Sequence, residues 1–407
     1  MKDLSYCEGK PIVVCGAGGI GKAIAADCVL AGQEVILCED ERFAPKTLAN
    51  LEHGFNFHGR QPNKIGLYRA GIAKFDRMTT DIPGAVKEAG VIVIALPAVG
   101  HEAFMKKIIP SLQDGQVIHI FPDNYGTLRF RKLMREMGCD KDIIVGGWSS
   151  APYGSRIDQE GTAMLSGTQI NYRAVTLRGC ALPTKDTDLF LESIKFMAAM
   201  DSVRLGDGPV AADTVLDTGF SNVNPILHCP GVILGCGALE NFGVRYGTTK
   251  KDFSIYCHVY SPTVSQVQYT VYCEEKAVAE ACGVGIQPFE KEEFFSRSNI
   301  LGPEYMGYDI HVPFDEEYPM AIGTGPFSVD SRYMTEDLPV GCHVYHELGK
   351  KFGVETPLID SMINFGNAML PQHNFWEEGV TLEDLGIGHM NKEQMLDYLH
   401  NGNYVEA

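Results

Sequence analysis

The sequence predicts an α/β protein with a doubly wound N-terminal domain, residues 1–202, followed by a mostly α-helical C-terminal domain, residues 203–407. Three observations support this. Short apolar runs of strand length alternate with helical patterns from residue 11 to about residue 200, as in a parallel sheet covered by helices. A glycine-rich turn joins the first apolar run to the first helical pattern. Beyond Val203 helical patterns dominate and strand-like runs are few.

The glycine-rich turn follows the apolar run Pro11–Cys15 and has the pattern G-x-G-x-x-G. The first glycine allows a sharp turn, the second lets a pyrophosphate approach the backbone, and the third lets the helix pack closely on the strand. The free N–H groups at the helix start favour phosphate. The predicted cofactor-binding residues of this turn are Gly16, Gly18, Gly19, Ile20 and Gly21. The alternative interpretation is that the pattern is only a tight turn in an ordinary α/β unit and binds no dinucleotide.

An acidic residue follows the second predicted strand. Glu39 stands 18 residues after Gly21, directly behind the apolar run Val35–Cys38. A carboxylate at this position can accept hydrogen bonds from the ribose hydroxyls and repels a 2′-phosphate. We therefore expect a Rossmann-type domain that binds NAD. Arg42 keeps NADP open, because an arginine just after the acid can hold a 2′-phosphate.

A third apolar run, Val91–Leu96, ends at Pro97. Ligands of open α/β sheets bind outside the carboxyl ends of the strands, so Pro97 is predicted to border the nicotinamide. His101 follows shortly afterwards. A residue at a helix start is the commoner role for such a histidine, and a role near the cofactor is the alternative.

Composition excludes several classes of function. The net charge of −18 makes nucleic acid and anionic membranes improbable partners, and the apolar runs are too short to span a membrane. The 12 cysteines include no C-x-x-C pair and lie in apolar stretches. We therefore expect reduced, mostly buried thiols in a cytoplasmic protein and no metal site.

The C-terminal domain must supply the chemistry, because a dinucleotide fold does not fix a reaction. In the stretch NPILHCPG, Asn224 and His228 are four residues apart and share a face if the chain is helical. A histidine in apolar surroundings suits proton transfer to or from a carbonyl or amine. A structural histidine bonded to a backbone carbonyl is the alternative.

The stretch RYMTEDLPVG carries the second group of candidates. Arg332 offers a planar fork that matches a carboxylate, and Asp337 could orient a histidine and stabilise its protonated form. Alternatively, Glu336 and Asp337 cap a helix that begins near Pro339.

Taken together, GAGGIG, LPAVGH, NPILHCPG and RYMTEDLPVG resemble the octopine/nopaline (opine) dehydrogenase family over nearly the whole chain and in the same order. The resemblance implies an enzyme that reductively condenses an amino acid with an α-keto acid such as pyruvate, through an imine and with NAD(P)H. It implies that His228 is the acid/base residue, Asp337 its partner and Arg332 a substrate-carboxylate ligand. Asn224, one helical turn from His228, is a further substrate-binding candidate.

Two other functions are alternatives. A 2-keto acid or 2-hydroxy acid oxidoreductase would use the same two-domain plan without an amine. A non-catalytic NAD sensor would need no acid/base pair, so Arg332, Asp337 and His228 argue against it. The family often has an acidic residue where Gly147 and Trp148 stand, so we expect Trp148 to reshape the substrate pocket. A homodimer is compatible with the sequence.

Overall fold

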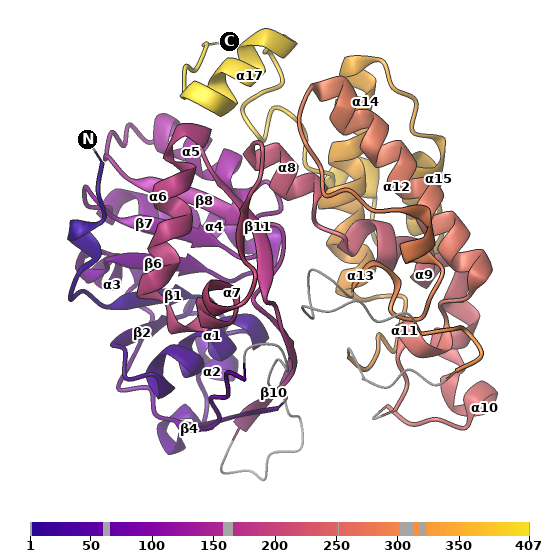
Figure 1. Ribbon diagram of the computed structural model, residues 1–407, viewed down its shortest axis with the longest axis horizontal. Coiled ribbons are helices and arrows are strands. Elements are labelled where there is room, and N and C mark those ends of the chain that lie inside the picture. The colour runs from indigo at the N-terminus through magenta and orange to yellow at the C-terminus, as the bar shows by residue number, and fades with distance from the viewer. Residues whose placement is uncertain are drawn as a thin grey trace. The chain divides into compact units, whose positions relative to one another are not determined.

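The computed structural model describes residues 2–59, 66–157, 166–250, 252–301, 312–316 and 323–406. Internal contacts divide them into two compact units (Figure 1). Unit 1 takes the described residues up to Thr218 together with Asp397–Asn403. Unit 2 takes the other described residues from Gly219 onward.

Unit 1 is built on a mixed eight-stranded sheet with the order β12-β11-β8-β7-β6-β1-β2-β5. The neighbouring strands β8, β7, β6, β1, β2 and β5 pair in parallel. Strand β11 is antiparallel to β8 and parallel to β12. The strand bounds are β1 Ile12–Cys15, β2 Val35–Cys38, β5 Arg77–Thr79, β6 Val91–Ile94, β7 Val117–Ile120, β8 Ile144–Trp148, β11 Thr176–Ala181 and β12 Gly208–Ala211. The central strands are buried throughout, which explains their continuous apolar runs. The predicted doubly wound domain is confirmed.

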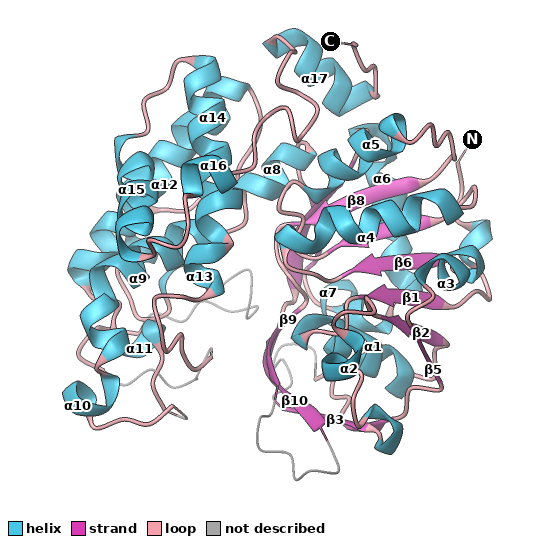
Figure 2. Ribbon diagram, turned by 180° about the vertical axis from the view of Figure 1, so that it is seen from behind, coloured by secondary structure: helices cyan, strands magenta, loops and turns pink. Residues whose placement is uncertain are grey.

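Helices cover both faces of this sheet (Figure 2). Alternate residues of β1 belong to different cores: Ile12 and Val14 pack with α1, while Val13 and Cys15 pack with α3, α4 and α5. This alternation follows from the two-residue period of a strand. The helices of unit 1 are α1 Gly19–Leu30, α2 Ala44–Thr47, α3 Ile82–Glu88, α4 His101–Ile108, α5 Gly126–Glu136, α6 Thr187–Glu192 and α7 Asp201–Leu205. Two more helices, α8 Val215–Phe220 and α17 Lys392–Asn401, each contain residues of both units.

A second, four-stranded sheet lies against α1, with the order β4-β3-β10-β9. Phe55, Phe57 and Tyr153 of this sheet share the hydrophobic core that contains the buried face of α1. Its strands are β3 Phe55–Gly59, β4 Gly71–Ala73, β9 Tyr153–Ile157 and β10 Ser166–Arg173. The helix that begins at the glycine turn is therefore held between two sheets.

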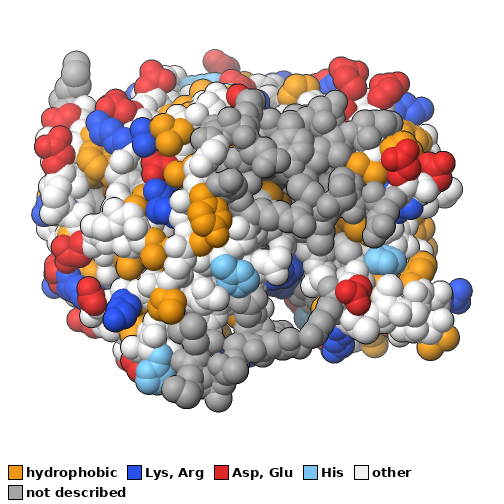
Figure 3. Space-filling view, turned by 60° about the horizontal axis from the view of Figure 1, so that its bottom comes forward, with side chains coloured by type: hydrophobic (Ala, Val, Ile, Leu, Met, Phe, Trp, Pro, Cys, Tyr) orange, Lys and Arg blue, Asp and Glu red, His pale blue; other side chains and the backbone are white. Residues whose placement is uncertain are grey.

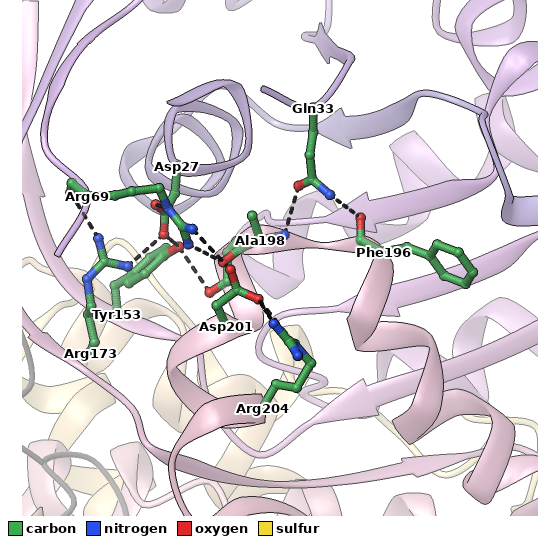
Figure 4. A network of polar contacts seen from close by, with 10 residues as sticks. Asp27, Gln33, Arg69, Tyr153, Arg173, Phe196, Ala198, Asp201 and Arg204 are labelled. Carbon is green, nitrogen blue, oxygen red and sulfur yellow. Dashed lines mark hydrogen bonds and ion pairs between the residues drawn. The ribbon is translucent and has the colours of Figure 1, made fainter. Parts of the chain in front are cut away.

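A buried carboxylate joins α1 to the second sheet (Figure 4). Asp27 of α1 is fully buried and accepts hydrogen bonds from Tyr153, Arg173 and Arg69 at 2.5, 2.6 and 2.6 Å. Arg69 also pairs with Asp201 at 3.0 Å. Buried charges are tolerated when they are paired and hydrogen-bonded, and here one carboxylate is shared by two guanidinium groups. The network fixes the position of α1.

Unit 2 is helical. Its helices are α9 Asn224–Glu240, α10 Phe242–Tyr246, α11 Ile255–His258, α12 Pro262–Cys282, α13 Arg332–Thr335, α14 His343–Phe352, α15 Pro357–Met369 and α16 Phe375–Glu378. One helical pattern spans Thr214–Glu240 in the sequence, but the structure breaks it between Phe220 and Asn224. Pro225 stands in the first turn of α9, where its missing N–H costs nothing, whereas the interior of a longer helix would lose a hydrogen bond there.

Glu275 of α12 is fully buried, and burial raises its pKa well above the usual value, although the Tyr345 hydroxyl opposes the rise. The folded protein keeps this carboxyl protonated at a pH where the unfolded chain ionises it. This contribution to stability is therefore present below the unfolded-state pKa and is lost as pH rises towards the folded-state pKa.

Glu275→Gln, which has no ionisation to suppress, is expected to gain Tm relative to the wild type as pH rises from about 5 to about 8, a range that lies above the unfolded-state pKa of glutamate. Thermal unfolding at several pH values measures this difference. Glu280→Gln on the exposed face of α12 is the control and should follow the wild type. A Glu275→Gln difference that is the same at every pH contradicts the prediction.

The surface carries charges of both signs. On the face drawn in Figure 3, Lys and Arg side chains are interspersed among Asp and Glu. Among the described residues, no helix combines the length and apolar character needed to cross a membrane.

Candidate functional site

The glycine turn has the shape that a pyrophosphate needs. At Gly16 φ is +101°, and an added Cβ would lie 2.2 Å from the Leu96 side chain. At Gly21 it would lie 1.8 Å from the Gly16 carbonyl oxygen. At Gly18, the residue before α1, an added Cβ would meet no atom within 4 Å. A side chain at Gly16 or Gly21 would thus collide with other atoms of the protein. A side chain at Gly18 would not, and Gly18 leaves open space beside the first residues of α1, Gly19 and Ile20. The turn therefore fits a dinucleotide.

Gly18→Ala is expected to leave Tm unchanged and to weaken NADH binding, because the new methyl group meets only the open space that a pyrophosphate would enter. Gly21→Ala should lose both stability and binding, because its methyl group collides with the backbone. Fluorescence titration with NADH and thermal unfolding separate the two effects. Wild-type affinity in Gly18→Ala would contradict the assignment.

Glu39 lies at the carboxyl end of β2 and contacts the glycine turn. Its carboxylate accepts from the backbone N–H of Ala17 at 3.0 Å, from the Thr47 hydroxyl at 3.0 Å and from the N–H of Asp40 at 2.8 Å. These bonds hold a buried negative group where the sequence predicts the ribose. A 2′-phosphate at this position would meet the carboxylate directly.

Arg42 is already engaged. Its Nε donates to Asp40 Oδ1 at 2.8 Å, and Lys107 donates to the other oxygen of Asp40 at 2.7 Å. These two cations hold the pKa of Asp40 well below its usual value. Arg42, which the sequence indicates as a possible ligand of the NADP 2′-phosphate, is therefore paired with the neighbouring carboxylate of Asp40.

Pro97 directly precedes a short 3₁₀ turn, Ala98–Gly100, behind β6. His101 begins α4, is fully buried, and its Nε2 lies 3.3 Å from the Leu96 carbonyl oxygen. Burial lowers the pKa of His101 to about 3, so the imidazole stays neutral at physiological pH. This favours the structural role for His101.

The expectation for Trp148 is wrong. Trp148 is fully buried in the core, stacks on Phe121 and donates from Nε1 to His119 Nδ1 at 3.1 Å. Residues two apart on a strand share a face, so Trp148 points the same way as Ile144, towards Phe190 of α6. It is a fully buried core residue.

The second cluster lies wholly in unit 2 and centres on His228. Its Nδ1 lies 2.8 Å from Asp337 Oδ2, and its Nε2 lies 2.9 Å from the Tyr256 hydroxyl. The Tyr333 ring stacks on the imidazole, with a centroid distance of 3.5 Å and an interplanar angle of 6°. The structure thus brings together His228 and Asp337, which are 109 residues apart in the chain.

Local sequence explains how these groups meet. α9 begins at Asn224, which places His228 one turn into the helix. Asp337 begins a π-helical turn, Asp337–Cys342. Within that turn, a Cβ at Gly341 would lie 2.3 Å from the Pro225 side chain, so only glycine allows the turn to pack on the start of α9. Glu336 is the N-cap residue of this turn and makes no side-chain cap hydrogen bond, and the Asp337 carboxylate faces the histidine.

The substrate-binding candidates lie nearby in the chain. Arg332 begins α13, its side chain is 64% exposed, and it donates to Glu336 Oε2 at 2.7 and 2.6 Å. Asn224 is half-buried at the start of α9, one turn before His228. Their roles towards a substrate stay predictions.

Tyr256 and Tyr333 were not predicted. Tyr333 stands four residues before Asp337, a spacing that signals a shared helix face. Tyr256 belongs to the short helix α11, 28 residues after His228, and no spacing rule connects the two. Only the packing of α11 on α9 reveals it.

Among the described residues, no group of three or more His, Cys, Asp or Glu side chains is arranged so that it could hold a metal ion. All twelve cysteines are free thiols, and most are buried, as the sequence predicts.

Comparison with known proteins finds similar chains. The family model for the NAD/NADP octopine/nopaline dehydrogenase alpha-helical domain matches residues 211–370, which contain His228 and Asp337. The opine dehydrogenase of Arthrobacter sp. (strain 1C) is 28% identical over 392 residues, covering 93% of this chain and 96% of the relative. The vitopine synthase of Allorhizobium ampelinum is 22% identical over 342 residues, covering 80% and 82%.

Solved structures share the fold. An octopine dehydrogenase structure with NADH and L-arginine has a TM-score of 0.64 at 16% identity, covering 98% of this chain and 99% of that one. A yersinopine dehydrogenase structure with NADP+ has a TM-score of 0.62 at 12% identity, covering 96% and 98%. The motifs, the fold and the matched helical domain agree: residues 211–370 match the octopine/nopaline dehydrogenase helical domain, and the chain is similar to an opine dehydrogenase over 93% of its length.

Proposed function

We propose that this chain is an opine dehydrogenase, an NAD(P)H-dependent oxidoreductase that condenses an amino acid with an α-keto acid such as pyruvate and reduces the resulting imine. The observation that carries the proposal is the His228–Asp337 pair at 2.8 Å inside the helical domain that the family model matches. Support comes from the Arthrobacter opine dehydrogenase and from octopine dehydrogenase structures that hold NADH with L-arginine or with pyruvate.

We assign cofactor binding to residues 1–202 and substrate chemistry to residues 203–407. Gly16, Gly18, Gly19, Ile20, Gly21, Glu39 and Pro97 are the residues that would hold the dinucleotide. A bound nicotinamide supplies the hydride for the reduction. Glu39 beside the turn and Arg42 paired with Asp40 favour NADH over NADPH.

Within unit 2, Asp337 can only accept a hydrogen bond when ionised, so it holds the proton of His228 on Nδ1. The lone pair of Nε2 is then the basic site of the pair, and the Tyr256 hydroxyl lies 2.9 Å from it. Arg332, with its exposed guanidinium, is proposed to bind a substrate carboxylate, and Asn224 to orient a polar substrate group on the same helix face.

The test follows NADH or NADPH absorbance with purified protein, pyruvate and a panel of amino acids. Oxidation that requires both the keto acid and an amine supports the proposal and identifies the amine. Oxidation with the keto acid alone indicates the amine-free oxidoreductase instead. Binding of NADH without turnover across the panel points to the sensor.

The reduced thiols are consistent with the predicted cytoplasmic location. A homodimer is the proposed assembly, and light scattering of the purified protein measures it.

A further inference from the structure

Both nitrogens of His228 are occupied by protein groups. Asp337 takes Nδ1, and the Tyr256 hydroxyl lies 2.9 Å from Nε2. All three residues are more than nine-tenths buried. A substrate therefore meets Nε2 only through the Tyr256 hydroxyl, or after that hydroxyl has moved away.

Donor and acceptor rules fix the direction of the chain of bonds. The Asp337 carboxylate accepts from Nδ1–H, so neutral His228 has a lone pair on Nε2. The Tyr256 O–H must then donate to that lone pair. The order Tyr256 to His228 to Asp337 has the logic of a Ser-His-Asp triad, with a phenol in place of the alcohol.

Tyr256 is held for this contact. The Tyr260 ring meets its ring edge-on at 5.3 Å, and the Tyr260 hydroxyl donates to the Leu227 carbonyl oxygen at 2.9 Å. Leu227 is the residue before His228, so the segment just after α11 is tied to α9 at the histidine. On the other side, Tyr333 covers the imidazole face, and its hydroxyl lies 3.5 Å from that of Tyr256.

We propose that Tyr256 is a catalytic residue: its hydroxyl exchanges the proton with the substrate, and His228 relays that proton behind it. The inference rests on the proposed function and names a group that neither the motifs nor the spacing of the sequence indicate. A hydroxyl in such a relay suits the reaction, because one proton must reach the leaving oxygen when the amine and the keto acid condense.

Before the proton is transferred to the substrate, His228 is an imidazolium, and its Nε2–H donates to the Tyr256 hydroxyl oxygen. The Tyr256 O–H proton passes to the hydroxyl of the carbinolamine, whose C–O bond breaks with its electron pair to release water. The nitrogen lone pair forms the C=N bond. Nε2–H then gives its proton to Tyr256, which leaves the neutral histidine and the hydrogen bond seen in the structure. Solvent returns one proton for the next cycle.

The kinetic test compares Tyr256→Phe with the control Tyr246→Phe. The Tyr246 hydroxyl donates to the backbone of His258, so the control also removes one tyrosine hydroxyl that contacts α11, but at the surface. We expect Tyr256→Phe to lower kcat about 10²-fold or more with little change in KM, as for a general acid. Tyr246→Phe should keep wild-type kinetics. Wild-type or faster turnover in Tyr256→Phe overturns the relay and leaves the proposed function standing.

A second readout is independent of turnover. In ¹⁵N NMR of histidine-labelled protein, with His228→Asn used to assign the signals, Tyr256→Phe should shift the Nε2 resonance of His228 because its hydrogen bond is lost, whereas Tyr246→Phe should not. An unchanged resonance in Tyr256→Phe overturns the relay. If the wild type fails to oxidise NADH with every pair of amine and keto acid, the proposed function is contradicted instead. The NMR result then tests the hydrogen bond between Tyr256 and His228 by itself.

Discussion

His228→Ala is expected to lower kcat of the NADH-dependent condensation about 10²- to 10⁴-fold, the range that a positioned general acid or base contributes. The imidazole is the group that can both accept and return a proton, and Asp337 holds it in one tautomer at 2.8 Å. Steady-state kinetics with saturating keto acid and amine measure the effect.

The same variant should bind NADH with wild-type affinity, because the glycine turn and Glu39 belong to unit 1 and His228 belongs to unit 2. Asp337→Asn is the matched variant. Its amide can donate to Nδ1 and so favour the wrong tautomer, which should lower kcat while preserving side-chain volume. An unchanged kcat in His228→Ala removes the histidine from the mechanism and returns it to the structural role.

Asp27→Ala is expected to cost about 3–5 kcal/mol of stability, as does breaking a buried ion pair by removing one partner. The substitution leaves the Arg173 guanidinium buried beside the Tyr153 hydroxyl with their shared acceptor gone, while Arg69 keeps Asp201. The midpoint of urea unfolding should fall accordingly.

Two variants define this effect. Asp27→Asn keeps an oxygen acceptor without the charge and should fall between Asp27→Ala and the wild type. Glu102→Ala removes an exposed ion pair with Lys106 and should cost at most about 1 kcal/mol. A similar small cost for Asp27→Ala would show that the network in Figure 4 does not hold α1.

The elements around the glycine turn were predictable because their signals are local. The turn pattern, the apolar period of β1 and β2, and the position of Glu39 all lie within about 30 residues, and each requires only its own neighbours to be recognised. The long helix α12 was predictable for the same reason. His228, Asp337, Arg332 and Asn224 were indicated by the family motifs that contain them.

Other features depend on contacts between residues that are far apart in the chain. The sheet that covers α1 combines β3 and β4 with β9 and β10, and no local pattern records that pairing. Trp148 looked like a pocket residue, but the strand alternation and Phe190 place it in the core. Tyr256 reaches His228 only because α11 packs on α9.

By itself, the sequence determined the fold class and the glycine turn, because glycine geometry and apolar period are properties of short stretches. Its resemblance to a known family indicated that Asp337 is the partner of His228. The tertiary structure decided which atoms meet: Glu39 with Ala17, Arg42 with Asp40, and Tyr256 with Nε2 of His228. Hydrogen bonds form or fail within a few tenths of an ångström, and only the packing of distant elements sets distances of that size.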